Sequence, residues 1–170
     1  MEKFRCKWCE QDADLRHYHD EIWGTKRATD EALFEALTLE IFQAGLKWAT
    51  IYHKRAGFRR AFAHYNIDEV AQFDEAKKEE LRKDASIIRH RMKIAATIYN
   101  AKQILMLQQQ YGSFRQFLDT LTPDERIPAL RQHFKHVGNT TAESFLIACG
   151  YIPAPHEKRC YLYVKEEGKS

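Results

Sequence analysis

The chain has 170 residues, 44% of them hydrophobic and 30% charged, with a formal net charge of +3 at pH 7. This suits a single globular domain with a hydrophobic core and excludes a disordered or fibrous protein. No apolar run approaches the length of a membrane span, and the first residues lack a signal-peptide core. We therefore expect a cytoplasmic protein that does not bind membranes.

Residues 1–28 are rich in cysteine, histidine and aromatic residues but show no regular periodicity. We expect an irregular segment that something other than a hydrophobic core must order. A helix then runs to about Leu46, because apolar residues recur along one face at helical spacing. Either Thr29 or Asp30 can cap its start.

Helical periodicity continues through the rest of the chain, and no alternating strand pattern appears. The further predicted helices cover 48–56, 58–64, 68–73, 75–83, 90–110, 113–120, 124–135 and 140–149. The Tyr111-Gly112 pair ends the longest of them, Pro123 fits a first helical turn, and Gly150 fits a C-terminal stop. Residues 150–170 are again predicted to be irregular. The sequence thus predicts an all-α protein with a helical body over 30–140.

The two irregular ends carry the candidate metal ligands. These are Cys6, Cys9, His17 and His19 near the start, and His156 and Cys160 near the end. Cysteines of a cytoplasmic protein are more often metal ligands or free thiols than disulfides. A tetrahedral set of sulfur and nitrogen ligands suits Zn²⁺, and a site with four protein ligands is structural. We predict one zinc ion that joins the two ends and offsets their ordering entropy.

The residues alone do not choose the fourth zinc ligand. The Cys-x2-Cys pair favours a set of Cys6, Cys9, His156 and Cys160. Free thiols and surface imidazoles remain the alternative interpretation. Cys149, at the end of an apolar helical run, fits a core thiol.

Basic residues are segregated along the chain. Three stretches contain no acidic residue, namely 47–67, 85–118 and 126–142. Their basic residues include Lys47, Lys54, Arg55, Arg59, Arg60, Arg89, Arg91, Lys93, Lys102, Arg115, Arg126, Arg131 and Lys135. Such segregation can produce one basic face, which is typical of proteins that bind a phosphate backbone. Ordinary solvated helix faces are the alternative.

Glu40 stands out because it lies within the apolar string Leu39-Glu40-Ile41-Phe42. A lone carboxylate in such surroundings is paired, protonated or functional. Trp48 and Tyr52 follow closely and could stack on a planar ligand. The structural alternative is that the rings belong to the core and that Glu40 only accepts hydrogen bonds from backbone amides.

These residues belong to an ordered series of motifs that spans nearly the whole chain. The series is Cys6-x-Trp8, Tyr18-His19-Asp20, Trp23-Gly24, Leu39-Glu40, Gln43-Ala44-Gly45-Leu46, Trp48, Ile87-Ile88-Arg89-His90-Arg91, Lys93-Ile94, Asn100-Ala101, Val137-Gly138 with Thr140, Ala148-Cys149-Gly150 and His156-x3-Cys160. In this series the chain resembles the bacterial DNA-3-methyladenine glycosylase I family of the helix-hairpin-helix superfamily. The resemblance implies a single unit over 1–170, with the helix-hairpin-helix DNA glycosylase fold and a zinc site that joins the terminal segments 1–28 and 150–170.

The resemblance also implies an activity and its residues. The enzyme would flip 3-methyladenine out of alkylated double-stranded DNA and hydrolyse its N-glycosidic bond, with water as the nucleophile and without lyase activity. The implied residues are Glu40 for catalysis; Tyr18 and Trp48 for the base pocket; Gly45 and Leu46 for the gap left in the duplex; Ser86, Arg89, Arg91 and Lys93 for the DNA backbone; and Cys6, His19, His156 and Cys160 for zinc. His19 thus replaces Cys9 as a ligand. Residues 75–94 would form the helix-hairpin-helix.

Other glycosylases of this superfamily carry a catalytic aspartate some twenty residues after the hairpin. The first acidic residue after the hairpin here is Asp119, which lies too far along the chain. Glu40 is therefore expected to be the main carboxylate of the pocket. No obligate protein partner is evident, and we expect a monomer.

Several positions depart from the family pattern close to the expected pocket and hairpin. Ile41 and Phe42 are larger or less polar than usual, and Phe42 could crowd the pocket. Lys47 replaces a serine, Glu21-Ile22 is unusual, and Ser86 replaces a glycine whose flexibility would aid approach to a phosphate. Two alternatives follow: a glycosylase with an altered range of alkylated bases, or a non-catalytic DNA-damage-binding module, which a pocket plugged by Phe42 would favour.

Overall fold

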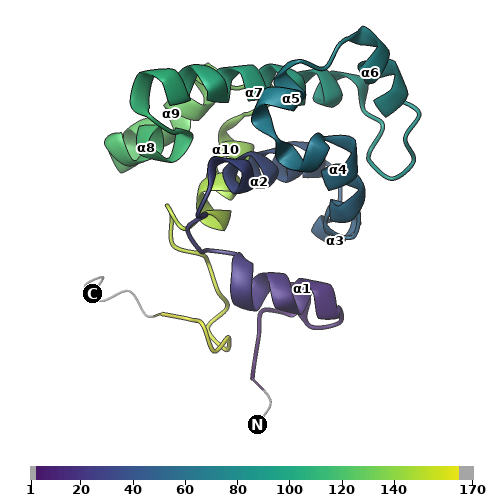
Figure 1. Cartoon of the computed structure of the whole chain (residues 1–170). Helices are drawn as coiled ribbons and strands as arrows, with labels where there is room; N and C mark the ends of the chain where they lie inside the picture. The colour runs from purple at the N-terminus through teal and green to yellow at the C-terminus, as the bar shows by residue number, and fades with distance from the viewer. Residues whose placement is uncertain (1–2, 165–170) are drawn as a thin grey trace.

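The computed structural model describes residues 3–164, and every regular element in this range is helical. The elements are η1 (Lys7–Cys9), α1 (Ala13–His17), η2 (Tyr18–Ile22), α2 (Asp30–Gln43), α3 (Trp48–Tyr52), α4 (Arg55–Ala61), η3 (Ala63–Tyr65), α5 (Ile67–Ala71), α6 (Glu75–Leu81), α7 (Arg91–Tyr111), α8 (Phe114–Thr120), α9 (Pro123–His133) and α10 (Asn139–Ala148) (Figure 1). The prediction of an all-α protein is confirmed. Within residues 3–164, none of the helices combines the length and the apolarity that a bilayer crossing requires.

Helix α2 is the centre of the hydrophobic core. Nearly all of its side chains between residues 33 and 42 are buried, and the helix packs against α3, α7, α8 and α10. Much of the core is phenylalanine, with Phe34, Phe42, Phe58 and Phe62 fully buried. In Figure 1 the long helix α7 spans the top of the molecule, above α2 and α10.

The start of α2 shows which of its two candidate residues is the cap. Thr29 is the N-cap, because its side-chain oxygen accepts a hydrogen bond from the Ala32 amide at 3.1 Å. The Asp30 carboxylate instead accepts hydrogen bonds from the amides of Phe114 at 2.9 Å and Arg115 at 3.2 Å. Asp30 therefore joins α2 to the first turn of α8 rather than capping the start of α2.

The predicted helices over 48–56 and 58–64 are divided differently in the structure. Lys54 leaves helical geometry at φ −93° and ψ 4°, so one short helix ends at Tyr52 and the next begins at Arg55. Residues 63–65 then adopt left-handed conformations, with φ between 53° and 61°. By contrast, Gly112, with φ +92°, ends α7 where the sequence predicted a stop.

The prediction that residues 1–28 are irregular, of which the structure describes 3–28, is wrong for residues 7–9 and 13–22. Here two helical turns, η1 and η2, flank α1, and Asp12 caps α1 by accepting hydrogen bonds from the amides of Asp14 at 2.8 Å and Leu15 at 3.1 Å. Such short elements depend on capping, which leaves no periodic pattern in the sequence. The segment from 150 to 164 has no regular element, as predicted.

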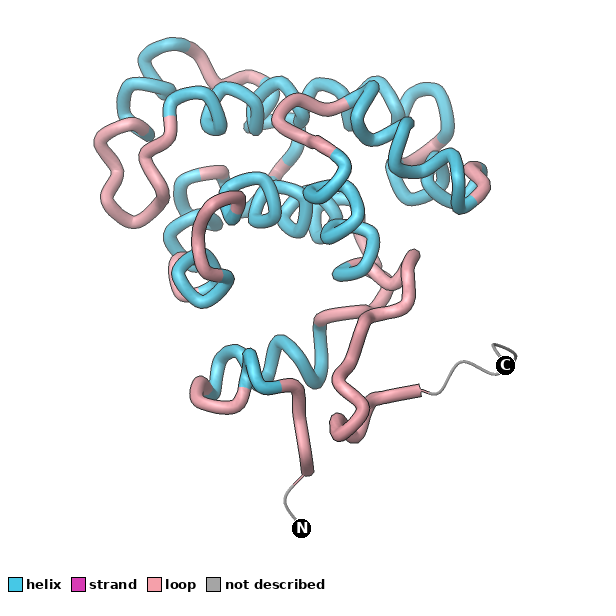
Figure 2. Tube along the Cα trace, turned by 180° about the vertical axis from the view of Figure 1, so that it is seen from behind, coloured by secondary structure: helices cyan, strands magenta, loops and turns pink. Residues whose placement is uncertain are grey.

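The two terminal segments lie together, below the helical body in Figure 2. The Tyr161 amide donates a hydrogen bond to the Phe4 carbonyl oxygen at 2.8 Å, and the Lys7 amide donates one to the Glu157 carboxylate at 2.7 Å. The start of the described chain is therefore packed directly against its end.

Candidate functional site

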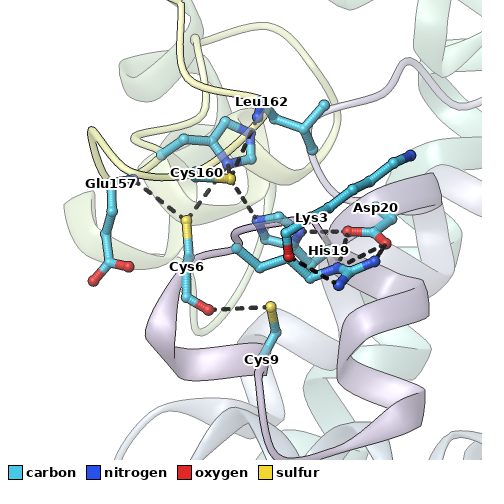
Figure 3. A network of polar contacts seen from close by, with 10 residues as sticks. Lys3, Cys6, Cys9, His19, Asp20, Glu157, Cys160 and Leu162 are labelled. Atoms are coloured by element: carbon cyan, nitrogen blue, oxygen red, sulfur yellow. Dashed lines mark hydrogen bonds and ion pairs between the residues drawn. The ribbon is translucent and has the colours of Figure 1, made fainter. Parts of the chain in front are cut away.

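Four side chains from the two terminal segments meet in one cluster. They are Cys6, His19, His156 and Cys160, and their ligand atoms all lie within 4.8 Å of one another. Figure 3 shows Cys6, His19 and Cys160 converging from the two segments. This is the set that the family resemblance implied. Cys9 lies outside the cluster, where its Sγ donates a hydrogen bond to the Cys6 carbonyl oxygen at 3.2 Å.

The spacing of these ligand atoms can be compared with that of a metal site. The Cys160 Sγ lies 3.5 Å from His19 Nε2 and 3.6 Å from His156 Nδ1, and the Cys6 Sγ lies 3.6 Å from the same Nδ1. Zinc bonds of about 2.3 Å to sulfur and about 2.0–2.1 Å to nitrogen place two tetrahedral ligands about 3.5 Å apart. The four residues therefore fit a tetrahedral zinc ion.

Polar neighbours orient the cluster. The His19 Nδ1 lies 2.8 Å from an Asp20 carboxylate oxygen, and the Arg5 guanidinium donates to the same carboxylate at 3.0 Å. Burial would raise the pKa of Asp20, but hydrogen bonds from Arg5 and His19 hold that pKa at about 2. The Glu157 amide donates to the Cys6 Sγ at 3.3 Å. A carboxylate on the second ring nitrogen fixes the orientation and tautomer of a metal-binding histidine.

A cavity of about 560 Å³, which we call the aromatic cavity, lies between the terminal segments, α2 and α3. It is lined by Trp8, Leu15, Tyr18, Trp23, Glu40, Gln43, Lys47, Trp48, Ala49, Ser144, Ile147 and Pro155. The ring centroids of Tyr18 and Trp48 lie 5.2 Å apart. Glu40, Tyr18 and Trp48, which the sequence analysis grouped, thus reach the same cavity. Aromatic faces with a single carboxylate suit a planar ring that has polar edges or a positive charge.

Glu40 is the one acidic residue that lines the aromatic cavity, and its side chain is only 8% exposed. No group within residues 3–164 donates a hydrogen bond to it, which argues against the interpretation that it merely accepts backbone amides. Burial raises the pKa of Glu40 to about 7, while the charge of Arg27 opposes the rise. A carboxyl group of this kind, buried without a partner, is typical of a functional site.

The expectation that Phe42 crowds the pocket is wrong. Phe42 is fully buried and packs edge-on against Phe58, with ring centroids 4.8 Å apart, and it does not line the aromatic cavity. Residues two positions apart on a helix project from opposite faces, so Phe42 faces the core where Glu40 faces the cavity. Ile41 is buried in the same core. The cavity is therefore open beside Glu40.

An exposed turn follows α2 at the rim of the aromatic cavity. Gly45 has φ +83°, a conformation that favours glycine, and the Leu46 amide donates to the Gln43 carbonyl oxygen at 2.7 Å. The Leu46 side chain is 39% exposed although it is apolar. Neither Gly45 nor Leu46 lines the cavity, but Gln43 and Lys47 on either side of them do.

The predicted DNA-backbone residues lie where the turn 82–90 enters α7. Arg89 and Arg91 are exposed, and neither has an acidic partner within 4.0 Å among the residues described. The Lys93 Nζ donates to the Ala44 carbonyl oxygen at 3.4 Å, so the start of α7 lies beside the turn that carries Leu46. The structure thus brings the basic and the exposed apolar residues to one region.

Ser86 occupies a different position from these cations. Its Oγ donates to the Asp84 carboxylate at 2.6 Å, so the hydroxyl bonds within its own turn. The turn rests on α4 at Gly57, where an added Cβ would lie 2.2 Å from the Ser86 carbonyl oxygen. The Lys54 Nζ donates to the Ala85 carbonyl oxygen at 3.1 Å at the same contact. Ser86 therefore packs against α4, and its side chain is only partly exposed.

Part of the cavity wall was not predicted from the sequence. Trp8 and Trp23 line it, with ring centroids 5.3 Å apart, yet they entered only as motif residues without a pocket role. Their position beside the predicted zinc ligands was the one available signal. Arg27, whose charge lowers the pKa of Glu40, was not identified at all, because nothing in its local sequence distinguishes it.

Comparisons with known proteins agree on one family. The family profile described as methyladenine glycosylase matches residues 8–148. The chain is 36% identical to DNA-3-methyladenine glycosylase 1 of Escherichia coli (strain K12), over 87% of this chain and 91% of that protein. A crystal structure of 3-methyladenine DNA glycosylase I superposes with a TM-score of 0.85 and 34% identity, covering 95% of this chain and all of the other. A variant of 3-methyladenine DNA glycosylase I in complex with 3-methyladenine gives a TM-score of 0.84 and 31% identity over 92% of this chain and 96% of the other.

Proposed function

Because the chain belongs to the methyladenine glycosylase family, we propose that it is a DNA-3-methyladenine glycosylase, a hydrolase that removes 3-methyladenine from alkylated DNA in base-excision repair. The observation that carries the proposal is Glu40, a buried and unpaired carboxylate in a cavity walled by aromatic rings. A methyl group on N3 makes adenine cationic. The cavity therefore suits the base in aromatic character and in charge.

Hydrolysis of this N-glycosidic bond requires the protein mainly to bind the flipped base. A glycosidic bond inside a duplex is inaccessible, so the nucleotide must first be flipped out of the stack. A cationic adenine is already a good leaving group, and water attacks the sugar as the bond breaks. Glu40 would accept hydrogen bonds from the base edge and stabilise its charge, while Tyr18 and Trp48 would stack on its faces. We infer no covalent intermediate and hence no lyase step.

The region around Leu46 and the start of α7 supports a DNA surface. Leu46 would occupy the gap that the flipped nucleotide leaves, because it is an exposed apolar side chain at the rim of the cavity. Arg89, Arg91 and Lys93 would contact phosphates. The Lys93 amide is capped by His90, but the amides of Arg91 and Met92 at the N-terminus of α7 would add to this attraction for anions. In this proposal α6, the turn 82–90 and α7 form the helix-hairpin-helix.

We also propose that Cys6, His19, His156 and Cys160 hold one structural zinc ion. The support is the sulfur–nitrogen spacing of the cluster and the Asp20 carboxylate on His19. With four protein ligands the metal has no open position, so it would stabilise the fold and take no part in the reaction. The terminal segments and the helical body would then work as one unit, 1–170. Cavity and proposed DNA surface are completed within one chain, which supports a monomeric enzyme.

A base-release assay tests the proposed activity. We expect the purified protein to free 3-methyladenine from methylated duplex DNA much faster than the spontaneous loss measured without enzyme. A protein that binds the same duplex but releases no methylated adenine would overturn the proposal and favour the non-catalytic DNA-binding alternative. Duplexes that carry other alkylated bases, assayed in parallel, would define the substrate range.

A further inference from the structure

A second, smaller cavity of about 50 Å³ also reaches Glu40, and we call it the arginine cavity. Its wall shares Glu40, Tyr18 and Trp48 with the aromatic cavity, but it adds three cations, Arg27, Arg55 and Arg59. A polar cavity of this size admits only a few water molecules. Glu40, which is buried, and Arg27, which is partly buried, are therefore screened less than charges on the open surface.

Two of the three arginines are already paired with acids. The Arg59 guanidinium donates to the Glu35 carboxylate at 2.6 and 3.1 Å. Arg55 lies 3.4 Å from Asp14. The charges of Arg55 and Arg59 are thus largely balanced by these neighbours and act weakly beyond them.

Arg27 is in a different situation. Its guanidinium donates to the carbonyl oxygens of Ile22 at 2.9 Å and Thr25 at 2.6 Å, which fix its position. Within residues 3–164 it has no carboxylate within 4.0 Å. Arg27 and Glu40 are therefore the two charges on the arginine cavity that lack an ion-pair partner.

We propose that Arg27 is a positioning residue for base excision, whose fixed positive charge acts across the arginine cavity to keep Glu40 ionised. This inference rests on the proposed function, in which an ionised Glu40 holds a cationic base. A neutral carboxyl group in the same place would lose the attraction to that charge. Arg27 does not line the aromatic cavity and so would act only through Glu40.

The other titratable groups around Glu40 do not replace this charge. They are Tyr18 from η2, Tyr52 from α3, Cys149 at the end of α10, and Lys47 at the outer rim of the aromatic cavity. Burial raises the pKa of Tyr18 and of Tyr52, and it raises the pKa of Cys149 to about 12, so all three are neutral near pH 7. Lys47 is exposed to solvent, where its charge is screened.

The test is the pH dependence of excision in Arg27→Gln and Arg27→Lys. Single-turnover release of 3-methyladenine from methylated duplex DNA is measured from about pH 5.5 to about pH 9, with spontaneous release subtracted. The rate of release should rise with pH as Glu40 ionises. For Arg27→Gln we expect this rising limb to move upward by about one pH unit, which means about a tenfold lower rate at pH 6 and little change in rate at pH 9. Arg27→Lys keeps the charge and should keep the position of the limb.

Lys26→Gln is the matched control, because it removes the same charge from the neighbouring position. Lys26 points elsewhere, with its Nζ 3.8 Å from Asp119 and 4.5 Å from the centroid of Tyr151, and we expect a wild-type profile. An equal loss of the release rate at every pH in both Arg27 variants would overturn the proposal and assign Arg27 a purely structural role. A rising limb that does not move in Arg27→Gln would overturn it as well.

A direct titration separates this inference from the proposed function. The Glu40 side-chain carboxyl carbon is followed by NMR in the free protein, with Glu40→Gln assigning its signal. Arg27→Gln should move the midpoint upward, whether or not the protein excises 3-methyladenine. An unmoved midpoint would contradict the role of Arg27, whereas a wild type that releases no base would contradict only the proposed function.

Discussion

At the scale of single residues, the proposed chemistry depends on one buried carboxylate, Glu40. For Glu40→Gln we expect excision to fall by about a hundredfold or more, because the variant keeps the shape of the side chain but removes the charge that faces the cationic base. Duplex affinity should change little, since phosphate contacts made elsewhere dominate it. Single-turnover release and a binding titration on the same methylated duplex measure both quantities. Equal loss of release and binding would mean that Glu40 is structural.

Glu40, which is expected to favour excision, is expected to lower the stability of the folded protein at neutral pH. A carboxyl pKa raised from 4.5 to about 7 means that the folded protein holds a proton which the unfolded chain has released between these pH values. Stability therefore falls as pH rises through this window, by about 3 kcal/mol once the pH is above both values. Glu40→Gln should thus be more stable than wild type at about pH 8 and similar at about pH 4. Urea unfolding at the two pH values measures the difference, and a variant that is less stable at both would refute this account.

Glu40 could be singled out from the sequence as a candidate functional residue, but Arg27 could not. Glu40 stood out because a carboxylate within an apolar helix is unusual whatever the fold. The orientation of Phe42 toward the core could also have been predicted, because residues 40 and 42 project from opposite faces of a helix. Arg27 could not be predicted, because its relation to Glu40 exists only across a cavity that separate segments of the chain enclose.

At the scale of elements, the contact between α4 and the turn 82–90 sets where the start of α7 lies. Gly57→Ala would place a Cβ 2.2 Å from the Ser86 carbonyl oxygen, so the turn must move. We expect a loss of about 1–3 kcal/mol in the free energy of unfolding, together with weaker binding to undamaged duplex DNA. Chemical denaturation and a duplex-binding titration measure the two effects.

Gly138→Ala is the matched control for this substitution. Gly138 has φ −91°, and an added Cβ would meet nothing within 4 Å. We expect a smaller loss of stability than for Gly57→Ala, arising only from the weaker N-cap of α10. If the two alanine variants lost the same stability and the same duplex affinity, the contact with Ser86 would not be what positions the turn.

The long helices α2 and α7 and the short helices α5, α6 and α8 were predictable from the sequence, whereas α1 was not. The periodic apolar faces of α2 and α7 gave both helices, with ends correct to within a few residues. Helix α1 has only five residues and is held by the Asp12 cap and by packing of Leu15 and Tyr18 beside Tyr52. Without a core-facing period of its own, it was mistaken for an irregular segment.

At the scale of the whole molecule, the cluster of Cys6, His19, His156 and Cys160 joins the two terminal segments beside the aromatic cavity. We expect about one equivalent of zinc in freshly purified protein, retained by Cys9→Ala and reduced below about half by His19→Ala, because only His19 belongs to the tetrahedral set. Elemental analysis of the variants measures this. Equal retention by both, or less than about half an equivalent in the wild type, would contradict the proposed zinc site.

The ligand set itself depended on the family resemblance rather than on spacing. From the residues alone, the Cys-x2-Cys pair favoured Cys9, and nothing local distinguishes His17 from His19. In the structure His19 is fully buried and meets Cys160, whereas His17 is exposed. Which of two nearby histidines turns inward depends on how η2 packs, and that is a property of the folded molecule.

The cluster also determines which part of the protein can be completed last during its synthesis. Residues 33–149 hold the main core and can collapse as they leave the ribosome, but His19 can contact Cys160 only after residue 160 has been synthesised. Until then the proposed zinc site lacks one of its four ligands. We therefore expect a chain that ends before residue 160 to fold in large part but to retain no structural zinc.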